Sequence, residues 1–451
     1  MLMRQDLIER YDLRVPRYTS YPTAPHFSPA VEGDVYARWL SRLDTSLSLS
    51  LYLHIAYCAE MCWFCGCHTK ATKRYAPVAD YLDALLTEAR LVARALPARM
   101  KVDHIHFGGG SPTLLKPHDL AQTLAILREH YNVTLDADIA VELDPRTADE
   151  AYVAAMAKAG VTRASIGVQD FDERVQKAIN RIQPHEVTAR VIGWLRAHGV
   201  SAINMDLCYG LPYQTVESLL DTVDKAAALR PARIALFGYA HVPWMKPHQK
   251  LIPEESLPGL AERWTQYEAA AERLEGHGYV SVGLDHFALP DDEMAMAHAK
   301  GALHRNFQGY TTDAAPVLIG LGASAIGALP QGYAANELAI DRYKAAVREG
   351  RFPITRGIAV SGADRLRRDV IERLMCDMGV DLDEIALMHD VAADTFDDEL
   401  SRLSALEADG IVTRTGRRLT VTEEGRPLVR AVCAVFDEYL GQGQARHSKA
   451  V

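Results

Sequence analysis

The chain has 451 residues, 48% of them hydrophobic and 24% charged, which is typical of a globular protein with two or three domains and excludes disordered and fibrous classes. Its net charge of -10 argues against a nucleic-acid-binding role, because that role favours a basic surface. There is no signal peptide, and no run approaches the roughly 18 apolar residues of a membrane span, so we expect a cytoplasmic monomer without membrane or nucleic-acid partners.

The first predicted unit is an N-terminal arm over residues 1–45. This segment is rich in Pro, Tyr and Arg and lacks a clear periodicity, most visibly in VPRYTSYPTAPHFSP. It shows neither the alternation of a strand nor the repeat of an amphipathic helix. We therefore predict an ordered arm rather than an independent domain.

The second predicted unit is a catalytic domain over residues 46–350, in which short apolar runs alternate with longer amphipathic stretches. This alternation is typical of βα units and a parallel sheet. Six strands are predicted, at residues 50–55, 102–107, 138–143, 162–168, 201–207 and 232–238, with a further short element at 279–284. A doubly wound nucleotide-binding fold would carry GxGxxG after its first strand, and none is present there. We predict an α/β fold built as a partial (β/α)6 TIM-like barrel.

Four of the seven cysteines follow the first strand, between Tyr57 and Cys67, with the spacing CxxxCxxCxC. CxxxCxxC supplies three soft thiolates where a 4Fe-4S cluster has four ligands, so one iron would stay open for a cosubstrate. Phe64 places an aromatic ring beside the third thiolate. A disulfide framework is disfavoured by the odd number of cysteines. A structural zinc site would need a second CxxC-type pair or a matching pair of histidines.

Polar and glycine residues follow the other strands. The turn Gly108–Thr113 reads GGGSPT, and its glycines either let a ligand approach the backbone or simply form a tight turn. Glu142, Gln169 and Asp206 stand near the ends of the next three strands. Because carboxyl ends of parallel strands meet at one rim, we expect these groups to gather there. Taken singly, each of them, like Arg181, could be a salt-bridged surface residue. Tyr52, Ile326 and Ala240 are first interpreted as core or loop residues.

The third predicted unit is a C-terminal domain over residues 351–451. Helices are predicted at 363–379, 381–389 and 393–410, and a β-hairpin at 411–425 with its turn near Gly416. Three helices and a hairpin predict a winged-helix-like α+β domain. Such domains often bind DNA, but these helices are acid-rich, so we expect a packing or lid role instead.

Together these motifs resemble a known family. CxxxCxxC with an aromatic residue before the third cysteine, and GGGSPT after the second strand, are similar to the radical S-adenosylmethionine (SAM) enzymes. The added Gly66-Cys67, the arm sequence RYTSYPT and the acid-rich C-terminal domain resemble the oxygen-independent coproporphyrinogen III oxidases, also called coproporphyrinogen III dehydrogenases. The alternative is the related branch of haem chaperones without oxidase activity. That branch typically has an aromatic residue where Cys67 stands and lacks the arm motif, so both features favour the oxidases.

The resemblance implies a 4Fe-4S cluster and two molecules of SAM as cofactors, and no catalytic residue beyond their sites. It implies that Cys58, Cys62 and Cys65 bind the cluster, whereas Cys67 does not. The first SAM would contact Tyr52, Phe64, Gly109, Glu142 and Ile326. The second would contact Gly110, Ser111, Gln169, Arg181, Asp206 and Ala240. One departure is Ala56-Tyr57, where the superfamily usually has Pro and Phe, at positions without an implied ligand role.

The implied reaction is the oxidative decarboxylation of two propionates of coproporphyrinogen III to vinyl groups, giving protoporphyrinogen IX in haem biosynthesis. A 5'-deoxyadenosyl radical generated from SAM would start each step without oxygen. An electron donor and an electron acceptor are also implied, and the sequence does not identify them. Because the substrate is a tetracarboxylate, Arg17 and the cationic segment 244–250 are candidate contacts. A winged-helix DNA regulator that senses redox state through a cluster is a further alternative.

Overall fold

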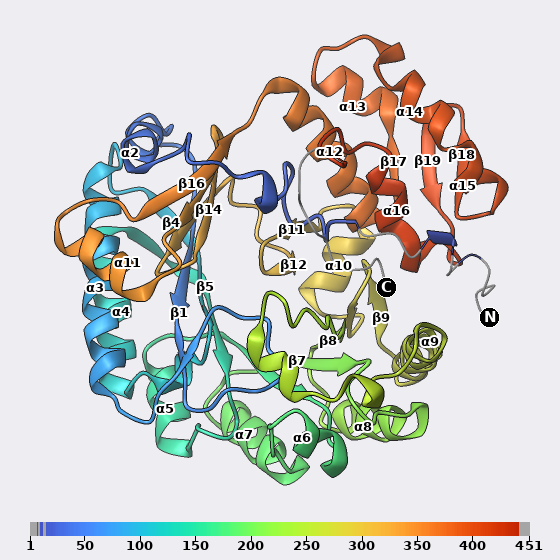
Figure 1. Ribbon diagram of the computed structural model, residues 1–451. Coiled ribbons are helices and arrows are strands. Elements are labelled where there is room, and N and C mark those ends of the chain that lie inside the picture. The colour runs from blue at the N-terminus through green and yellow to red at the C-terminus, as the bar shows by residue number, and fades with distance from the viewer. Residues whose placement is uncertain (1–6, 8–9, 12–14, 442–451) are drawn as a thin grey trace.

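Six parallel strands lie side by side in chain order at the centre of the structure, a computed structural model that describes residues 7, 10, 11 and 15–441 (Figure 1). They are β1 (Leu49–Ile55), β4 (Lys101–Gly109), β5 (Asn132–Leu143), β6 (Arg163–Gln169), β7 (Ala202–Tyr209) and β8 (Arg233–Gly238). Each strand pairs in parallel with the next one along the chain. A doubly wound sheet would reverse this order at its centre, so the predicted partial barrel is confirmed.

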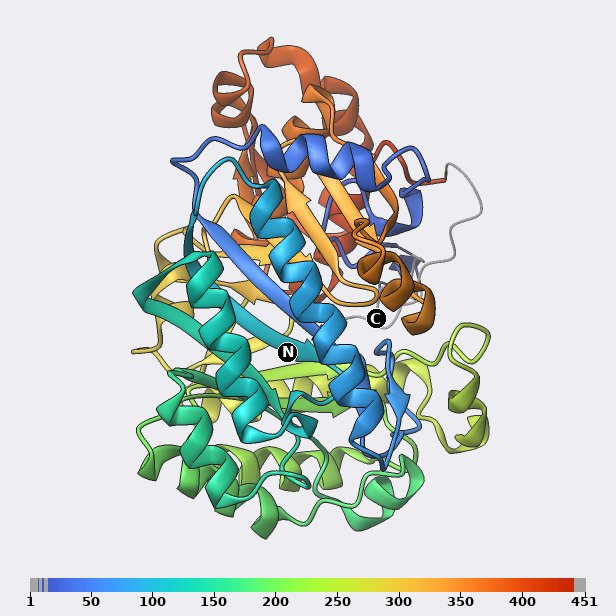
Figure 2. The ribbon, with the colours of Figure 1, turned by 90° about the vertical axis from the view of Figure 1, so that its left-hand side faces the viewer.

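Helices connect the strands and cover the outer face of the sheet, where α3 and α4 run beside each other in Figure 2. They are α3 (Ala76–Ala95), α4 (Pro117–His130), α5 (Glu150–Lys158), α6 (Glu173–Ala178), α7 (His185–Ala197), α8 (Val216–Ala228) and α9 (Leu260–Gly276). On α3, the apolar side chains of Val78, Leu82, Leu85, Ala89 and Val92 recur every three or four residues and are buried. Among the described residues, none of the helices combines the length and hydropathy needed to cross a bilayer.

The two faces of the barrel strands differ in chemistry. Along β6, the side chains of Ala164, Ile166 and Val168 are buried, whereas their neighbours in the sequence are partly exposed. Arg163 and Ser165 instead line a cavity inside the barrel. Because successive side chains of a strand point to opposite faces, the apolar core lies under the helices, and the interior is left for polar groups.

Short strands extend the sheet to twelve strands. The added strands are β13 (Val317–Leu321), β14 (Ile326–Leu329), β15 (Gly332–Asn336) and β16 (Ile354–Ala359) beside β1, and β10 (His286–Ala288) and β9 (Val280–Val282) beside β8. The sequence pattern predicts only the element at 279–284, because strands of this length are too short to show a clear alternation. The strand β16 lies beyond residue 350, the expected end of the catalytic domain.

The C-terminal part of the chain forms a smaller α+β unit, at the upper right of Figure 1. Its sheet has the order β17 (Gly379–Asp381), β19 (Arg418–Val421), β18 (Val412–Thr415), and its helices are α12 (Gly362–Asp377), α13 (Leu382–Met388), α14 (Asp397–Arg402), α15 (Ser404–Ala408) and α16 (Val429–Ala434). The predicted hairpin is present, with Gly416 at φ 64° in its turn. The prediction of one helix over 393–410 is wrong, because a 3-10 turn comes first and the helix is interrupted at Leu403.

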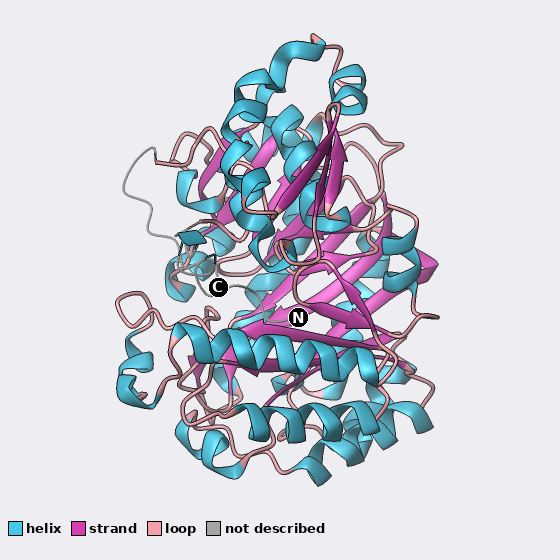
Figure 3. Ribbon diagram, turned by 90° about the vertical axis from the view of Figure 1, so that its right-hand side faces the viewer, coloured by secondary structure: helices cyan, strands magenta, loops and turns pink. Residues whose placement is uncertain are grey.

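The N-terminal arm is ordered against both parts of the molecule. It contains α2 (Gly33–Ser41), and a β-bridge joins it to β16. The Tyr18 hydroxyl donates to the Asp437 carboxylate at 3.1 Å, and the Glu438 amide donates to the Tyr21 hydroxyl at 3.0 Å. Figure 3 shows the smaller unit stacked above the barrel. Residues 1–6, 8–9 and 12–14 of the predicted arm lie outside the described residues.

A buried carboxylate links α3 to the strands beside β1. Glu88 is 2% exposed and accepts hydrogen bonds from the Tyr343 hydroxyl at 2.6 Å, the Gly322 amide at 2.7 Å and the Asn336 side chain at 2.7 Å. Burial raises the pKa of Glu88 to about 7, although all three donors oppose this rise. Glu88 therefore connects four segments at one point of the core.

Replacing Glu88 by Gln should lower the free energy of unfolding by about 1–3 kcal/mol, because an amide NH2 group would face donors and leave one of them unsatisfied. Equilibrium denaturation of the protein measures this change. The matched control is Glu129→Gln on the exposed side of α4, which should change the stability by less than about 0.5 kcal/mol. Equal stability of Glu88→Gln and the wild type would contradict this role of Glu88.

Candidate active site

The cysteine loop leaves the carboxyl end of β1 and is closed by a short parallel pair, β2 (Tyr57–Cys58) with β3 (Lys70–Ala71). Within it, Cys62 is buried, whereas Cys58 and Cys65 are partly exposed. The pair β2–β3 returns the chain to the point where the loop began. The three thiols are thereby held in one compact loop at the mouth of the barrel.

Hydrogen-bond donors already face two of the sulfurs. The Thr69 hydroxyl donates to Cys58 Sγ at 3.3 Å, and the Cys67 amide donates to Cys65 Sγ at 3.3 Å. Hydrogen bonds from Cys67 lower the pKa of Cys65 to about 7 against the effect of burial, whereas burial raises the pKa of Cys58 to about 11. Since the thiolate is the form that binds metal, the loop favours the ligand state at Cys65, and metal binding must release the proton of Cys58.

Two arginines face the buried thiol. Arg146 Nη2 lies 3.5 Å and Arg181 Nη1 lies 3.6 Å from Cys62 Sγ. Both guanidinium groups also pair with Asp144, at 2.7 and 3.7 Å. Arg181 Nε is buried and has no hydrogen-bond partner among the residues that the structure describes. Three soft thiols beside these positive charges fit an anionic iron–sulfur cluster, whose charge the guanidinium groups would stabilise.

The glycine turn after β4 is held by Glu142 on the neighbouring strand β5. The Gly109 amide donates to Glu142 Oε2 at 3.1 Å, and His106 Nε2 lies 3.2 Å from Oε1. A Cβ at Gly108 would lie 2.6 Å from Oε1 and 3.0 Å from the Tyr52 ring, so a larger residue would collide with both. The Glu142 side chain stays 39% exposed. A carboxylate at this rim is available to an ammonium group of a ligand.

Tyr52 and Ile326 reach the same part of the rim. Tyr52 on β1 lies opposite Gly320 on β13. A Cβ at Gly320 would lie 2.7 Å from the Ile326 carbonyl on β14, so both residues flank this glycine. Sequence reasoning interprets them first as core residues, but each is only partly buried. The structure thus brings Tyr52 and Ile326 to the side of the rim where Glu142 and the glycine turn lie.

The cationic segment after β8 lies over the cysteine loop. The Gln249 side chain donates to the Phe64 carbonyl at 2.9 Å and to the Ala240 carbonyl at 3.2 Å. Lys246 Nζ donates to the Cys67 carbonyl at 3.0 Å. Phe64 and Ala240, which lie far apart in the sequence, are therefore joined through one side chain of segment 244–250, for which the sequence predicts contact with the substrate and not this bridge.

A second cluster lies on β6 and β7. A Cβ at Gly167 would lie 3.1 Å from Arg181 Nη2 and 3.2 Å from the Gln169 side-chain nitrogen, and Asp206 stands opposite Gly167 on β7. The Asn204 side chain donates to Asp206 at 2.8 Å. Burial, with a smaller effect of the Glu142 charge, raises the pKa of Asp206 to about 6. These polar groups meet at the rim, as expected for the ends of parallel strands.

Gly110 and Ser111 lie against the start of the cysteine loop. Their amides donate to the carbonyls of Ile55 and Tyr57 at 2.7 and 2.8 Å. The Ser111 hydroxyl is 2.9 Å from that of Thr113, within the turn itself. Gly110 and Ser111 therefore tie the glycine turn to the cysteine loop, and within the part of the chain that the structure describes no hydrogen bond joins them to the cluster on β6 and β7.

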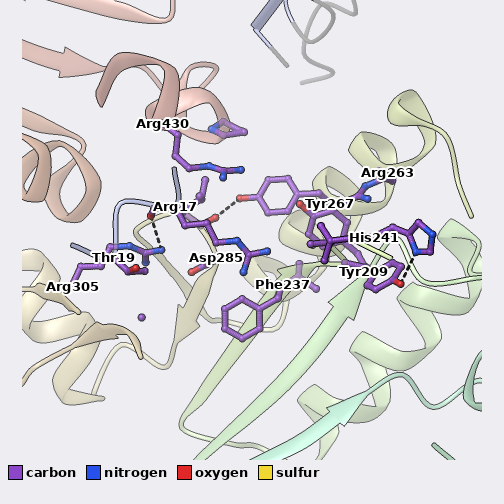
Figure 4. A pocket seen from close by; sticks show the side chains of 18 of the residues that line it. Arg17, Thr19, Tyr209, Phe237, His241, Arg263, Tyr267, Asp285, Arg305 and Arg430 are labelled. Carbon is purple, nitrogen blue, oxygen red and sulfur yellow. Dashed lines mark hydrogen bonds between the residues drawn. The ribbon is translucent and has the colours of Figure 1, made fainter. Parts of the chain in front are cut away.

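A cavity of about 380 Å³ lies next to this rim, between the barrel mouth, the arm and the smaller unit (Figure 4). It is lined by Arg17, Arg263, Arg305 and Arg430, together with Asp285 and Ala240. Of these four arginines, only Arg17 is a candidate contact from the sequence. The other three arginines come from α9, β11 (His304–Asn306) and α16, and no local motif connects segments so far apart.

Comparison with known proteins identifies the family. The profile of the Radical SAM superfamily matches residues 52–226, and that of the HemN C-terminal domain matches residues 360–428. The chain is 50% identical over 450 residues to the oxygen-independent coproporphyrinogen III oxidase of Bradyrhizobium diazoefficiens, across 100% of both chains. The chain belongs to the oxygen-independent coproporphyrinogen III oxidase family.

Further comparisons support this membership. The oxygen-independent coproporphyrinogen III oxidase of Paracoccus denitrificans is 43% identical, across 99% of this chain and 100% of the relative. The solved structure of coproporphyrinogen III oxidase (HemN) from Escherichia coli, described as a radical SAM enzyme, matches with a TM-score of 0.91 and 37% identity. It covers 95% of this chain and 100% of that one. The resemblance and the fold class are confirmed, and the radical SAM domain implies a 4Fe-4S cluster and SAM as cofactors.

Replacing Cys62 by Ser should abolish the bound iron of this coproporphyrinogen III oxidase family member, because the loop would lose one of the three thiolates predicted to bind the cluster. Iron and sulfide analysis of the anaerobically reconstituted protein measures the loss. Cys67→Ser, in the same loop, is the matched control and should keep the iron. Full iron content in Cys62→Ser would refute the ligand set.

Proposed function

We propose that this protein converts coproporphyrinogen III to protoporphyrinogen IX by turning two propionates into vinyl groups without oxygen, a step of haem biosynthesis. One observation carries the proposal. The three-thiol loop shares the barrel mouth with a cavity lined by aromatic rings and four arginines, and the Gln249 side chain joins Phe64 in this loop to Ala240 in the cavity lining. A tetrapyrrole needs apolar walls for its macrocycle and cations for its carboxylates.

We assign the cluster to Cys58, Cys62 and Cys65. Arg146 and Arg181 would balance its negative charge, and the Cys67 amide would keep its hydrogen bond to the sulfur of Cys65. Bound there, the cluster and SAM supply the 5'-deoxyadenosyl radical that takes a hydrogen atom from a propionate. The protein contributes placement of the reacting groups and exclusion of water.

We place two SAM molecules along the rim. The first contacts Tyr52, Phe64, Gly109, Glu142 and Ile326, where the partly exposed carboxylate can pair with an ammonium group. The second contacts Gly110, Ser111, Gln169, Arg181, Asp206 and Ala240. This second set extends from the cysteine loop to the cavity, because Ala240 lines the cavity and Arg181 faces Cys62. The second molecule would therefore lie nearer the substrate.

The product chemistry defines what else the protein requires. Loss of a hydrogen atom from the β-carbon, then of CO2 and one electron, turns a propionate into a vinyl group. A separate donor must supply the electron that starts each cycle, and a separate acceptor must take the electron released at its end. We propose that the protein acts as a cytoplasmic monomer. In it, the described parts of the arm (residues 1–45) and of the C-terminal domain (351–451) would close the mouth of the catalytic domain (46–350).

Incubation of the anaerobically reconstituted protein with a reductant, an electron acceptor, SAM and coproporphyrinogen III should yield 5'-deoxyadenosine, methionine, CO2 and protoporphyrinogen IX. Chromatography of the oxidised porphyrins measures the vinyl product. The Cys62→Ser protein is the matched control and should give none of these products. Formation of 5'-deoxyadenosine with no vinyl product would refute the substrate, and binding of haem without SAM cleavage would favour a chaperone.

Replacing Asp206 by Asn should weaken binding of one of two SAM equivalents by about tenfold or more, because SAM is a cation and the variant lacks the carboxylate. Anaerobic equilibrium binding to the reconstituted protein counts the equivalents. Asp83→Asn, an exposed position on α3, is the matched control and should bind both SAM equivalents as the wild type does. Binding of two SAM equivalents to Asp206→Asn with the affinities of the wild type would contradict the second SAM site.

A further inference from the structure

The cavity beside the rim has walls suited to a large flat ligand. Its aromatic lining consists of Tyr209, Phe237, Tyr239, Trp244, Tyr267 and Phe307. Rings of this kind offer wide apolar faces and edges with little conformational freedom to lose. A small anion would leave these surfaces uncovered, so the walls favour a planar organic ligand.

Positive charge dominates the same lining. The ionised side chains are the guanidinium groups of Arg17, Arg263, Arg305 and Arg430 and the carboxylate of Asp285. His286 Nδ1 lies 2.7 Å from Asp285 Oδ1. Burial raises the pKa of Asp285, but His286 and the nearby arginines lower it to about 2, so this carboxylate stays charged. Among the described residues of this lining, four guanidinium groups therefore face one carboxylate.

Two of the guanidinium groups, those of Arg305 and Arg263, are held in place without full hydrogen bonding among the described residues. Arg305 Nε and Nη1 and Arg263 Nε are buried and have no hydrogen-bond partner among the residues that the structure describes. Arg305 lies over the Tyr310 ring at 4.3 Å, and Arg263 lies 5.9 Å from the centre of the Tyr209 ring. Stacking of this kind orients a guanidinium plane and leaves its N–H groups available to a carboxylate.

The charges of neighbouring arginines affect the pKa of the fourth guanidinium group, that of Arg430. Arg430 is 7% exposed, and burial together with the charges of Arg17 and Arg305 lowers its pKa to about 10. Like charges gathered at this depth repel each other unless an anion is present. A carboxylate bound in the cavity would reduce the repulsion that Arg17 and Arg305 exert on Arg430.

The four arginines come from four separate segments: the arm, α9, β11 and α16. Figure 4 shows Arg17 and Arg305 on one side of the cavity, Arg430 above them and Arg263 beyond the tyrosines. A ligand with one carboxylate could engage one side of this set. A ligand with carboxylates around its edge can engage arginines of the arm, the barrel and the C-terminal domain together.

We propose that these four arginines bind the propionate carboxylates of the tetrapyrrole and set a preference for four propionates over two. The proposal rests on the proposed function, because it takes a tetrapyrrole as the ligand. Charge-assisted and often bidentate hydrogen bonds give each arginine–carboxylate pair its strength and direction. Binding of the substrate then also removes the mutual repulsion of the arginines and holds the arm and the C-terminal domain on the barrel.

Fluorescence titration of the reconstituted protein tests this preference with two stable porphyrins. Coproporphyrin III carries four propionates, and mesoporphyrin IX carries two. Arg305→Gln and Arg17→Gln should each weaken coproporphyrin III binding by about tenfold or more. Each should weaken mesoporphyrin IX binding less, because three arginines remain for two carboxylates. The preference for coproporphyrin III, expressed as the ratio of the two Kd values, should therefore fall.

Three further variants keep the test decisive. Arg94→Gln, an exposed position on α3, is the matched control and should leave both affinities unchanged. Arg305→Lys keeps the positive charge and should retain more of the preference than Arg305→Gln. Arg430→Gln alters a buried side chain, so its thermal unfolding is measured beside its affinities, and a folded variant should also lose preference.

The outcomes separate this proposal from the proposed function. The arginine assignment alone would be overturned if the wild type produces protoporphyrinogen IX while Arg305→Gln and Arg17→Gln weaken the binding of both porphyrins equally or not at all. A wild type that binds neither porphyrin and forms no vinyl product would overturn the proposed function as well. Loss of preference in Arg305→Gln and Arg17→Gln, with Arg94→Gln unchanged, supports the assignment.

Discussion

Parallel pairing of six strands in chain order is the constraint on which the candidate site depends. Because all six strands run in the same direction, their carboxyl ends and the loops that follow meet at one rim. Side-chain alternation then turns every second residue into the barrel, so Glu142 and Asp206 enter the interior while their apolar neighbours pack under the helices. The cysteine loop joins them because it follows β1, which lies between β4 and β13.

The second organising feature is positive charge concentrated in an acidic protein. The chain carries a net charge of -10, yet Arg146 and Arg181 face the buried thiol, and four arginines line the adjacent cavity. Guanidinium groups suit such positions because they keep their charge when buried and form bidentate hydrogen bonds with carboxylates. Local charge rather than net charge therefore decides which ligands this mouth attracts.

The arm and the smaller unit complete a site that the barrel alone would leave open. Tyr18 and Tyr21 of the arm bond to Asp437 and Glu438, and Arg17 and Arg430 reach the cavity from these two parts. A radical reaction needs water and oxidants kept away from the reacting atoms. The contacts between the arm and the C-terminal segment hold both parts beside the cavity, where Arg17 and Arg430 can reach a ligand.

The sequence by itself determined the thiol spacing, the six barrel strands in their order, the glycine turn and the C-terminal hairpin. Each of these is a local pattern, in which neighbouring residues carry the periodicity or the ligand spacing. Only the tertiary structure decided that Arg181 faces Cys62, that Gln249 joins Phe64 to Ala240, and that short strands continue the sheet from β13 to β16. It also decided that arginines from four segments share one cavity, because contacts between residues remote in the chain leave no local pattern in the sequence.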